Sequence, residues 1–310
     1  MVQIAASEAV SPDVEGKAFA LSPDQQLMLD EADRFARNEL YPLAAKMDDD
    51  EWWPENVFED IGEAGYFGLT VPEEYGGQGL DLFTSGIVAQ AFARWNYALS
   101  LSWIAHENLC LNNIYRNANE FLRNKYLPGL CSGKKIGALG LTEPGAGSDA
   151  LGSMATTAKL EGDVYVLNGR KLYITNGPVA DVLLVYAKTA PEKGAHGISA
   201  FIIEKDFPGF SVAQKLVKMG FRGSQTGELV FDDCEVPVEN MVGGENEGVV
   251  ITMSGLDLEL EMPESKRLLH STLPPSWKMV NSSSMIVWCW DAEQGVGAAA
   301  DEESEPKMRR

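Results

Sequence analysis

The spacing of the apolar residues changes once along this 310-residue chain, near residue 136. Before that point, apolar side chains recur every three or four residues, which is typical of helices that bury one face. After it come short runs that are apolar or that alternate apolar with polar residues, as in β-strands. These runs are residues 157–160, 164–167, 171–175, 182–188, 198–204 and 227–231. Because no helical stretch separates them, a doubly wound parallel sheet is excluded and an antiparallel β domain is expected.

Capping and breaking residues delimit the helices of the first part. Ser22, Pro23 and Gln25 predict a helix start, with Ser22 as the N-cap and Gln25 completing a capping box. Pro42 is expected near the end of that helix, and the acidic run 48–51 is interpreted as a solvated turn. Further helices are predicted at residues 54–65, 83–95 and 119–130.

The pair Asn168 and Gly169 lies between two of the strand runs and predicts a type I′ hairpin turn. With helices before it and strands around it, the chain is expected to be an α+β protein. The expected divisions are a flexible N-terminal tail (1–20), an all-α N-terminal domain (21–135), a middle β-barrel or sandwich domain (136–245), the start of an incomplete C-terminal helical domain (246–261) and an irregular tail (262–310).

Charge and cysteine content exclude several classes of function. The formal net charge is −21, so binding to nucleic acid or to an anionic membrane surface is not expected. No apolar run reaches the roughly 20 residues that a membrane helix needs. The 4 cysteines and 3 histidines are scattered without a CxxC pair, so no metal site is predicted and a reducing compartment is expected. Residues 1–20 lack the features of a secretory signal or a mitochondrial presequence, so no targeting segment is visible.

A glycine-rich segment, residues 137–149, is the first candidate for a binding site. Its glycines let the backbone approach a flat or charged ligand, and its N–H groups and the Thr142 and Ser148 hydroxyls can donate hydrogen bonds. The alternative is a loop without a ligand, since such segments often only connect elements. In the YITNG segment, Tyr173 and Thr175 share one face of a strand and would cover and hydrogen-bond a ring. The alternative there is a core tyrosine with an exposed threonine.

A third candidate is residues 220–237, a tight loop that leads into an edge strand ended by Pro237. Arg222 in this loop is interpreted either as a phosphate ligand or as the partner of nearby acids. Taken together and in this order, EEYGGQGLD, LTEPGAGSD, YITNG and GFRGSQTGELVFDDCEVP resemble the acyl-CoA dehydrogenase family over residues 21–259. The resemblance implies a flavoenzyme in which FAD accepts a hydride from the β-carbon of an acyl-CoA thioester while a carboxylate removes the α-proton.

The resemblance also implies roles for particular residues. The FAD-binding residues would be Leu139, Leu141, Thr142, Gly147, Ser148, Tyr173, Ile174 and Thr175. Thr142 would donate to the flavin ring, Ser148 would also contact the acyl-CoA, and residues 173–175 would cover the isoalloxazine. Many members of the family carry Trp where this chain has Tyr173.

The catalytic base implied by the resemblance is Glu259. In isovaleryl-type members the base lies on the helix that begins the C-terminal domain, and Glu259 matches that position, while Asp257 matches an aspartate that contacts CoA. Without the resemblance, Glu259 would be interpreted as a solvated helical acid. The chain departs from the family directly afterwards, where residues 260–263 (LEMP) replace an arginine and a long apolar helix; Val250 also replaces a tyrosine.

The implied reaction is α,β-dehydrogenation of a short branched-chain acyl-CoA, isovaleryl-CoA to 3-methylcrotonyl-CoA, in leucine catabolism. Electrons would pass to an electron-transfer flavoprotein, and intact family members are expected to be homo-oligomers. A different class of function is a truncated, non-catalytic relative that only binds ligand or partner subunits, and a third is an acyl-CoA oxidase. The location would be the cytoplasm in a bacterium and the mitochondrial matrix in a eukaryote.

Overall fold

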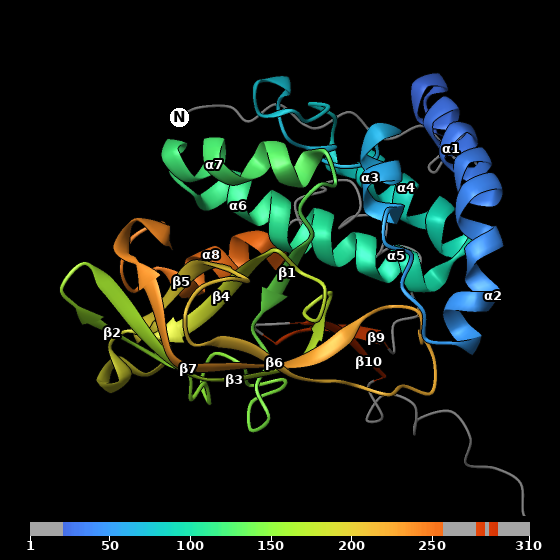
Figure 1. The fold of residues 1–310 in the computed structure, drawn as a ribbon. Helices are drawn as coiled ribbons and strands as arrows, with labels where there is room; N and C mark the ends of the chain where they lie inside the picture. Colours follow the sequence, from blue (N-terminus) through green and yellow to red (C-terminus); the bar gives the residue numbers. More distant parts are fainter. Residues whose placement is uncertain (1–20, 257–276, 283–284, 291–310) are drawn as a thin grey trace, which may run out of the picture.

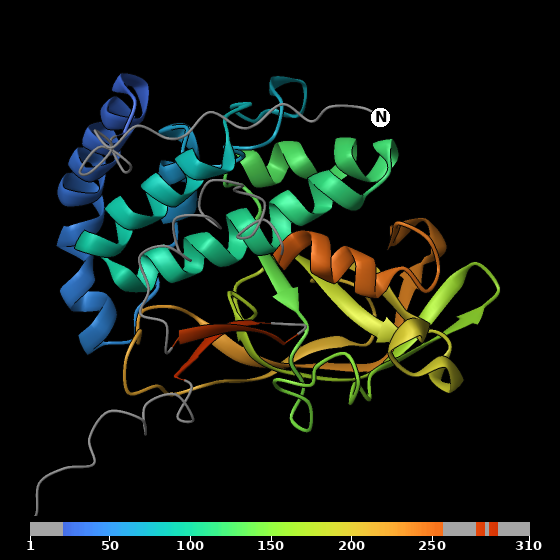
Figure 2. The ribbon, with the colours of Figure 1, turned by 180° about the vertical axis from the view of Figure 1, so that it is seen from behind.

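The computed structural model describes residues 21–256, 277–282 and 285–290 (Figure 1). The α-helices are α1 (Pro23–Phe35), α2 (Tyr41–Asp49), α3 (Val57–Glu63), α4 (Leu82–Trp95), α5 (Tyr97–Ile104), α6 (Asn112–Asn117), α7 (Glu120–Cys131) and α8 (Gly248–Leu256). The strands are β1 (Gly137–Gly140), β2 (Thr157–Glu161), β3 (Val164–Thr175), β4 (Val182–Lys188), β5 (Ile198–Glu204), β6 (Phe210–Lys215), β7 (Thr226–Pro237), β8 (Met241–Val242), β9 (Trp277–Ser282) and β10 (Met285–Trp290). Helices α1 to α7 gather on one side of the sheet, which confirms the α+β class (Figures 1 and 2).

Within the described residues, eight strands form one sheet in the order β6-β7-β3-β2-β4-β5-β8, with β1 pairing β4. The pairing is antiparallel except that β4 runs parallel to β1, where Gly137 lies opposite Val182, and to β2 at a single pair. The predicted β domain is confirmed, but it is mixed rather than wholly antiparallel. The physical reason is that a long excursion, residues 141–181, separates β1 from β4 and allows a crossover that a tight hairpin would not.

The hairpin predicted at Asn168 and Gly169 is wrong, because β3 continues through both residues. The Asn168 side chain donates to Asp233 Oδ1 of β7 at 3.0 Å and accepts from the Asp233 N–H at 2.9 Å. The register of β3 against β7 shifts at this point, so the pair forms a β-bulge. The turn between β2 and β3 instead contains Gly162, whose φ is 68°.

The predicted start of the first helix is confirmed and its predicted end is not. Ser22 Oγ accepts from the Gln25 N–H at 3.2 Å, and the Ser22 N–H donates to Gln25 Oε1 at 2.9 Å. The chain then continues through a π-helical turn, Ala36–Leu40, into α2. Pro42 lies in the first turn of α2, where a missing N–H is tolerated because the wider turn before it already interrupts the α-helical hydrogen bonding.

A continuous helical stretch over residues 97–117 was not predicted from the sequence. It comprises α5, a π-helical segment (Ala105–Leu111) and α6, and most of its side chains are buried. A helix surrounded by other elements has no polar face, so its apolar residues show no clear period. This stretch brings His106 and Glu107 into the interior, each fully buried.

The central strand β4 is buried on both faces. Leu184 and Tyr186 pack into the core beneath the helices, whereas Leu183 and Val185 pack into a second core with β3 and β7. Alternate residues of a strand point to opposite faces, so both faces must be apolar. This explains why β4 is an uninterrupted apolar run rather than an alternating one.

Helix α8 lies between α6 and β5, where Figure 2 shows it against the sheet. Ser254 Oγ donates to Asn117 Oδ1 at 3.0 Å. Gly255 lies so close to Asn113 that an added Cβ would be 2.2 Å from its amide nitrogen. A small residue is therefore needed for this helix contact.

Strands β9 and β10 form a separate antiparallel pair, with Met285 opposite Ser282. They lie within residues 262–310, for which the sequence predicts an irregular tail. At these two strands that prediction is wrong. The reason is that β-branched and aromatic residues in 285–290 favour extended pairing even without an alternating pattern. Among the helices of the described ranges, none combines the length and the apolar character needed to cross a membrane.

Candidate functional site

Two of the candidate segments meet at a bulge in β3. The register of β3 against β7 shifts between Lys171 and Ile174, and within this bulge the Leu172 N–H donates to the Thr142 carbonyl at 2.9 Å. A bulge re-aims side chains, and Tyr173 here has φ 61°, the left-handed region that a bulky residue rarely adopts. The glycine-rich loop after β1 and the YITNG turn therefore lie side by side.

A buried ion pair stabilises the contact between the glycine-rich loop and the β3 bulge, which we call the junction. Lys171 Nζ lies 2.8 Å from Glu143 Oε1, and the two side chains are 0% and 4% exposed. The ammonium also donates to the Leu141 carbonyl at 3.2 Å. The Glu143 carboxylate accepts from the N–H groups of Ala155 at 2.6 Å and Thr156 at 3.0 Å. The pair thus holds residues 141–143 of the glycine-rich loop against β3 and ties them to residues 155 and 156 before β2.

The pKa values of this pair reflect burial and mutual attraction. Burial lowers the pKa of Lys171 to about 8, although Glu143 opposes the shift. Burial acts to raise the pKa of Glu143, but Lys171 and the hydrogen bonds outweigh it and the pKa is lowered. Both groups are therefore charged near neutral pH. Sequence reasoning missed the pair, since a strand lysine and a loop glutamate carry no local signal of burial.

The other predicted residues differ in exposure. Leu139 and Leu141 are half-buried and pack against the core beneath the helices, whereas Gly147 and Ser148 are exposed. Tyr173 is 66% exposed. The alternative of a core tyrosine is therefore wrong, because the bulge turns this side chain outward.

Thr142 and Thr175 are half-buried, and Ile174 is buried in the core that β3 shares with β7. Asn176 follows in the left-handed region, with φ 64°. The side-chain nitrogen Nδ2 of Asn176 donates to the carbonyls of Ser102 at 2.8 Å and Gly137 at 3.1 Å. The YITNG turn is thereby tied both to α5 and to the start of β1.

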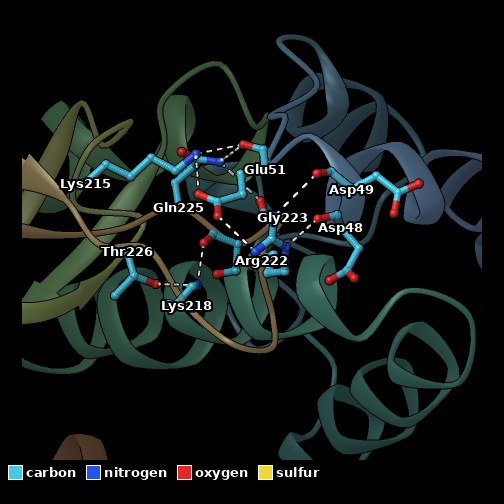
Figure 3. Close-up of polar contacts among 10 residues, drawn as sticks. Asp48, Asp49, Glu51, Lys215, Lys218, Arg222, Gly223, Gln225 and Thr226 are labelled. Atoms are coloured by element: carbon cyan, nitrogen blue, oxygen red, sulfur yellow. Dashed lines mark hydrogen bonds and ion pairs between the residues drawn. The ribbon is translucent and has the colours of Figure 1, made fainter.

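The loop residue Arg222 takes the second of its two expected roles. Its guanidinium pairs with the Glu51 carboxylate at 3.3 Å and donates to the Asp48 carbonyl at 2.7 Å (Figure 3). The acidic run 48–51 is therefore a solvated turn only in part: Asp49 and Asp50 are exposed, whereas Asp48 and Glu51 are half-buried and the Glu51 carboxylate pairs with cations of the β domain. Asp257 and Glu259 lie outside the described residues.

His106 ties the start of β1 to helix α7. Its Nδ1 accepts from the Gly137 N–H at 2.8 Å, so Nε2 carries the proton and donates to the Leu130 carbonyl at 3.1 Å. Burial lowers the pKa of His106 to about 3, against the smaller opposing effect of the Leu130 carbonyl. The neutral ring is therefore part of the fold that positions the glycine-rich loop.

Folding stability is expected to depend on this histidine at mildly acidic pH. The unfolded state binds a proton below a pKa of about 6.5 and the native state does not, so stability falls as pH drops through that value. Between about pH 7.5 and about pH 5, the loss from this group is about 2 kcal/mol. Urea unfolding at both pH values should show this loss as a difference between variants: on going from pH 7.5 to pH 5, the wild type should lose about 2 kcal/mol relative to His106→Gln.

The exposed His196 provides the matched control, since His196→Gln should keep the wild-type pH dependence. Glu107 is buried beside His106, and its pKa is raised to about 7 by burial, but it is common to all three proteins and cancels in the comparison. An unchanged pH dependence in His106→Gln would contradict the neutral, buried histidine.

Comparison with known proteins adds to this geometry. The model of the acyl-CoA dehydrogenase N-terminal domain matches residues 22–134, and that of the middle domain matches residues 138–234. The chain is 46% identical over 250 residues to the mitochondrial isovaleryl-CoA dehydrogenase of Pongo abelii, covering 79% of this chain and 59% of that protein.

Solved structures agree. Butyryl-CoA dehydrogenase from Megasphaera elsdenii superposes with a TM-score of 0.74 at 39% identity, over 77% of this chain and 63% of that one. The FAD complex of PigA superposes with a TM-score of 0.74 at 34% identity, over 78% of this chain and 63% of that one.

A helical domain followed by a β domain whose first strand leads into a glycine-rich loop, with each domain matched by a family model, defines a flavoprotein oxidoreductase fold. The chain belongs to the acyl-CoA dehydrogenase family, whose members are FAD-dependent. It spans 59% of the length of the Pongo abelii relative.

The residues at the junction fit the FAD that the family implies. At Gly145 and Gly147, an added Cβ would meet no atom within 4 Å, so the loop backbone is open to a ligand. Threonine hydroxyls at 142 and 175 supply neutral donors, and the outward Tyr173 ring supplies a flat apolar surface. Such a set suits an uncharged ring system with hydrogen-bonding edges.

Proposed function

We propose that this chain binds FAD and dehydrogenates a short branched-chain acyl-CoA, converting isovaleryl-CoA to 3-methylcrotonyl-CoA in leucine catabolism. The observation that supports it most is the junction of the glycine-rich loop with the β3 bulge, through the Leu172–Thr142 hydrogen bond. The isovaleryl preference is supported by the likeness to the Pongo abelii protein, while the butyryl-CoA structure marks straight short chains as the competing substrate class.

The roles proposed for the chain's own residues are those that the resemblance to the family implies. Thr142 donates a hydrogen bond to the edge of the ring, and Leu139, Leu141 and residues 173–175 cover it and exclude water. Gly147 allows the loop backbone to approach the flavin closely, and Ser148 contacts both the flavin and the acyl-CoA. Bound FAD supplies the hydride acceptor.

The proton chemistry is assigned to the residues after α8. Glu259 removes the α-proton of the thioester, and Asp257 contacts the CoA portion. We further propose that electrons pass to an electron-transfer flavoprotein and that the working form is a homo-oligomer. The location would be the mitochondrial matrix or, for a bacterial protein, the cytoplasm.

The test is the visible absorption spectrum of the purified protein, recorded before and after anaerobic addition of isovaleryl-CoA. A flavin band that bleaches is expected, because hydride transfer reduces the flavin. Butyryl-CoA in a parallel experiment should bleach the band more slowly. A band that is absent, or that no acyl-CoA changes, would contradict the proposal and favour a non-catalytic relative. Rapid peroxide formation in air would instead favour an oxidase.

A further inference from the structure

The end of helix α2 is capped by side chains from the β domain (Figure 3). In addition to its contacts with Asp48 and Glu51, Arg222 donates to the Asp49 carbonyl at 3.3 Å. Lys215 Nζ donates to the Glu51 carbonyl at 2.7 Å. The last carbonyls of a helix lack intrahelical partners and carry partial negative charge, so cations there satisfy and stabilise them. We use the name α2 clasp for the side chains of Glu51, Lys215, Arg222 and Gln225 together with the backbone carbonyls of Asp48, Asp49 and Glu51.

The α2 clasp continues directly into the YITNG turn. Gln225 Nε2 donates to the Glu51 carbonyl at 3.3 Å, while the Gln225 carbonyl accepts from the Asn176 N–H at 2.7 Å. The next residue, Thr226, pairs with Thr175 across β7 and β3. Residues 222–226 therefore contact the helical domain on one side and the YITNG turn on the other.

Gly223 and Ser224, which lie between α2 and the YITNG turn, are tightly packed. Ser224 Oγ lies 2.9 Å from Ser102 Oγ of α5, whose carbonyl also accepts from Asn176. At Gly223, an added Cβ would be 2.5 Å from Met47 Cβ of α2. A displacement of this segment would therefore move both its neighbours, because interiors at this density do not absorb it locally.

Backbone strain concentrates at the same place. Of the six non-glycine residues with positive φ in the described ranges, four lie here: Glu51 (51°), Tyr173 (61°), Asn176 (64°) and Phe221 (53°). Such conformations persist only where surrounding contacts hold them, and they cluster at functional sites. Lys215 and Gln225 of the α2 clasp hold the Glu51 backbone, and the Gln225 carbonyl holds Asn176.

We propose that Arg222 is a positioning residue, which caps α2 and thereby holds the Thr175–Asn176 turn in the conformation that receives the flavin ring. The inference rests on the proposed function for the identity of the ligand. Its physical basis is that one planar guanidinium fork contacts three acceptors, on Asp48, Asp49 and Glu51. A glutamine has only two N–H donors, and a lysine would have to reach all three acceptors from a single nitrogen.

The experiment measures amide hydrogen exchange by mass spectrometry in the ligand-free full chain. In Arg222→Gln, exchange over residues 172–177 is expected to be at least about tenfold faster than in the wild type. Exchange over residues 164–168, on the same strand, should be unchanged. Arg170→Gln is the matched control, because Arg170 pairs with Glu228 between the same two strands but outside the clasp.

A second readout is flavin binding. Arg222→Gln should weaken FAD affinity at least about tenfold and change the visible circular dichroism of the bound flavin, while Arg170→Gln should do neither. Arg222→Lys should lie between the two. Glu51→Gln, which removes the carboxylate acceptor and leaves the backbone carbonyls, should give a smaller acceleration of exchange over residues 172–177. If Arg222→Gln does not fold, the exchange of Glu51→Gln tests the positioning role instead.

The outcomes separate this inference from the proposed function. Exchange that stays at the wild-type rate over residues 172–177, or that accelerates equally over 164–168, would overturn the positioning role whether or not FAD binds. If the wild-type protein binds no FAD while Arg222→Gln still shows faster exchange over residues 172–177, the proposed function is overturned and the positioning role is supported.

Discussion

Replacement of Lys171 by Met should destabilise the protein by about 3–5 kcal/mol, because it leaves the Glu143 carboxylate buried without its cation. The exposed fractions of 0% and 4% mean that water cannot replace the lost partner. Urea unfolding at neutral pH measures the effect. The matched control is Lys159→Met, since Lys159 also pairs with a glutamate, Glu161, and both lie on β2, but these side chains are 79% and 52% exposed. That change should leave the free energy of unfolding almost unchanged, because solvent screens the exposed pair.

A double variant separates the ion pair from simple packing. Lys171→Met combined with Glu143→Gln removes both charges, so stability should recover by about 1–3 kcal/mol relative to Lys171→Met alone. Equal losses for Lys171→Met and Lys159→Met would contradict the buried charged pair. Since Glu143 holds residues 155 and 156 as well as β3, we also expect the single variant to lose flavin during purification.

Replacement of Glu259 by Gln should slow flavin bleaching by isovaleryl-CoA about a hundredfold to ten-thousandfold while the flavin band itself remains. The amide has nearly the same shape as the carboxylate but cannot accept the α-proton, so only the chemical step is affected. Rapid-mixing absorbance under anaerobic conditions measures the bleaching rate. Glu261→Gln, two residues further along, is the matched control and should bleach at the wild-type rate.

Normal bleaching by Glu259→Gln would show that another group is the base. Loss of the flavin band in Glu259→Gln but not in Glu261→Gln would instead assign Glu259 a part in cofactor binding. The spectrum of each purified variant shows whether flavin is bound, and the rapid-mixing measurement then gives the bleaching rate.

Local signals predicted much of the fold because they depend only on neighbouring residues. The Ser22 capping box and the change of period near residue 136 are of this kind, since caps and amphipathic faces arise within a few residues. Asn168 and Gly169 show the limit. The same two residues suit a hairpin turn or a bulge, and it is Asp233 on β7 that favours the bulge.

The candidate site was predictable by its motifs but not by its contacts. The glycine-rich loop and YITNG are recognisable as segments, yet nothing local indicates that a bulge turns Tyr173 outward. The Lys171–Glu143 pair joins residues 28 positions apart, and its importance comes from burial alone. The role of Arg222 needs helix α2 beside it, more than 170 positions away in the chain.

Residue order and spacing were thus sufficient for the α+β class, the family and the segments that carry the candidate site, because periodicity, caps and motifs are short-range properties. Long-range packing set the parallel β1–β4 pairing, the outward Tyr173, the charge state of the Lys171–Glu143 pair and the α2 clasp. Each of these depends on which distant groups exclude water from a site and which hydrogen-bond partners remain there, and burial of that kind exists only once the chain has folded.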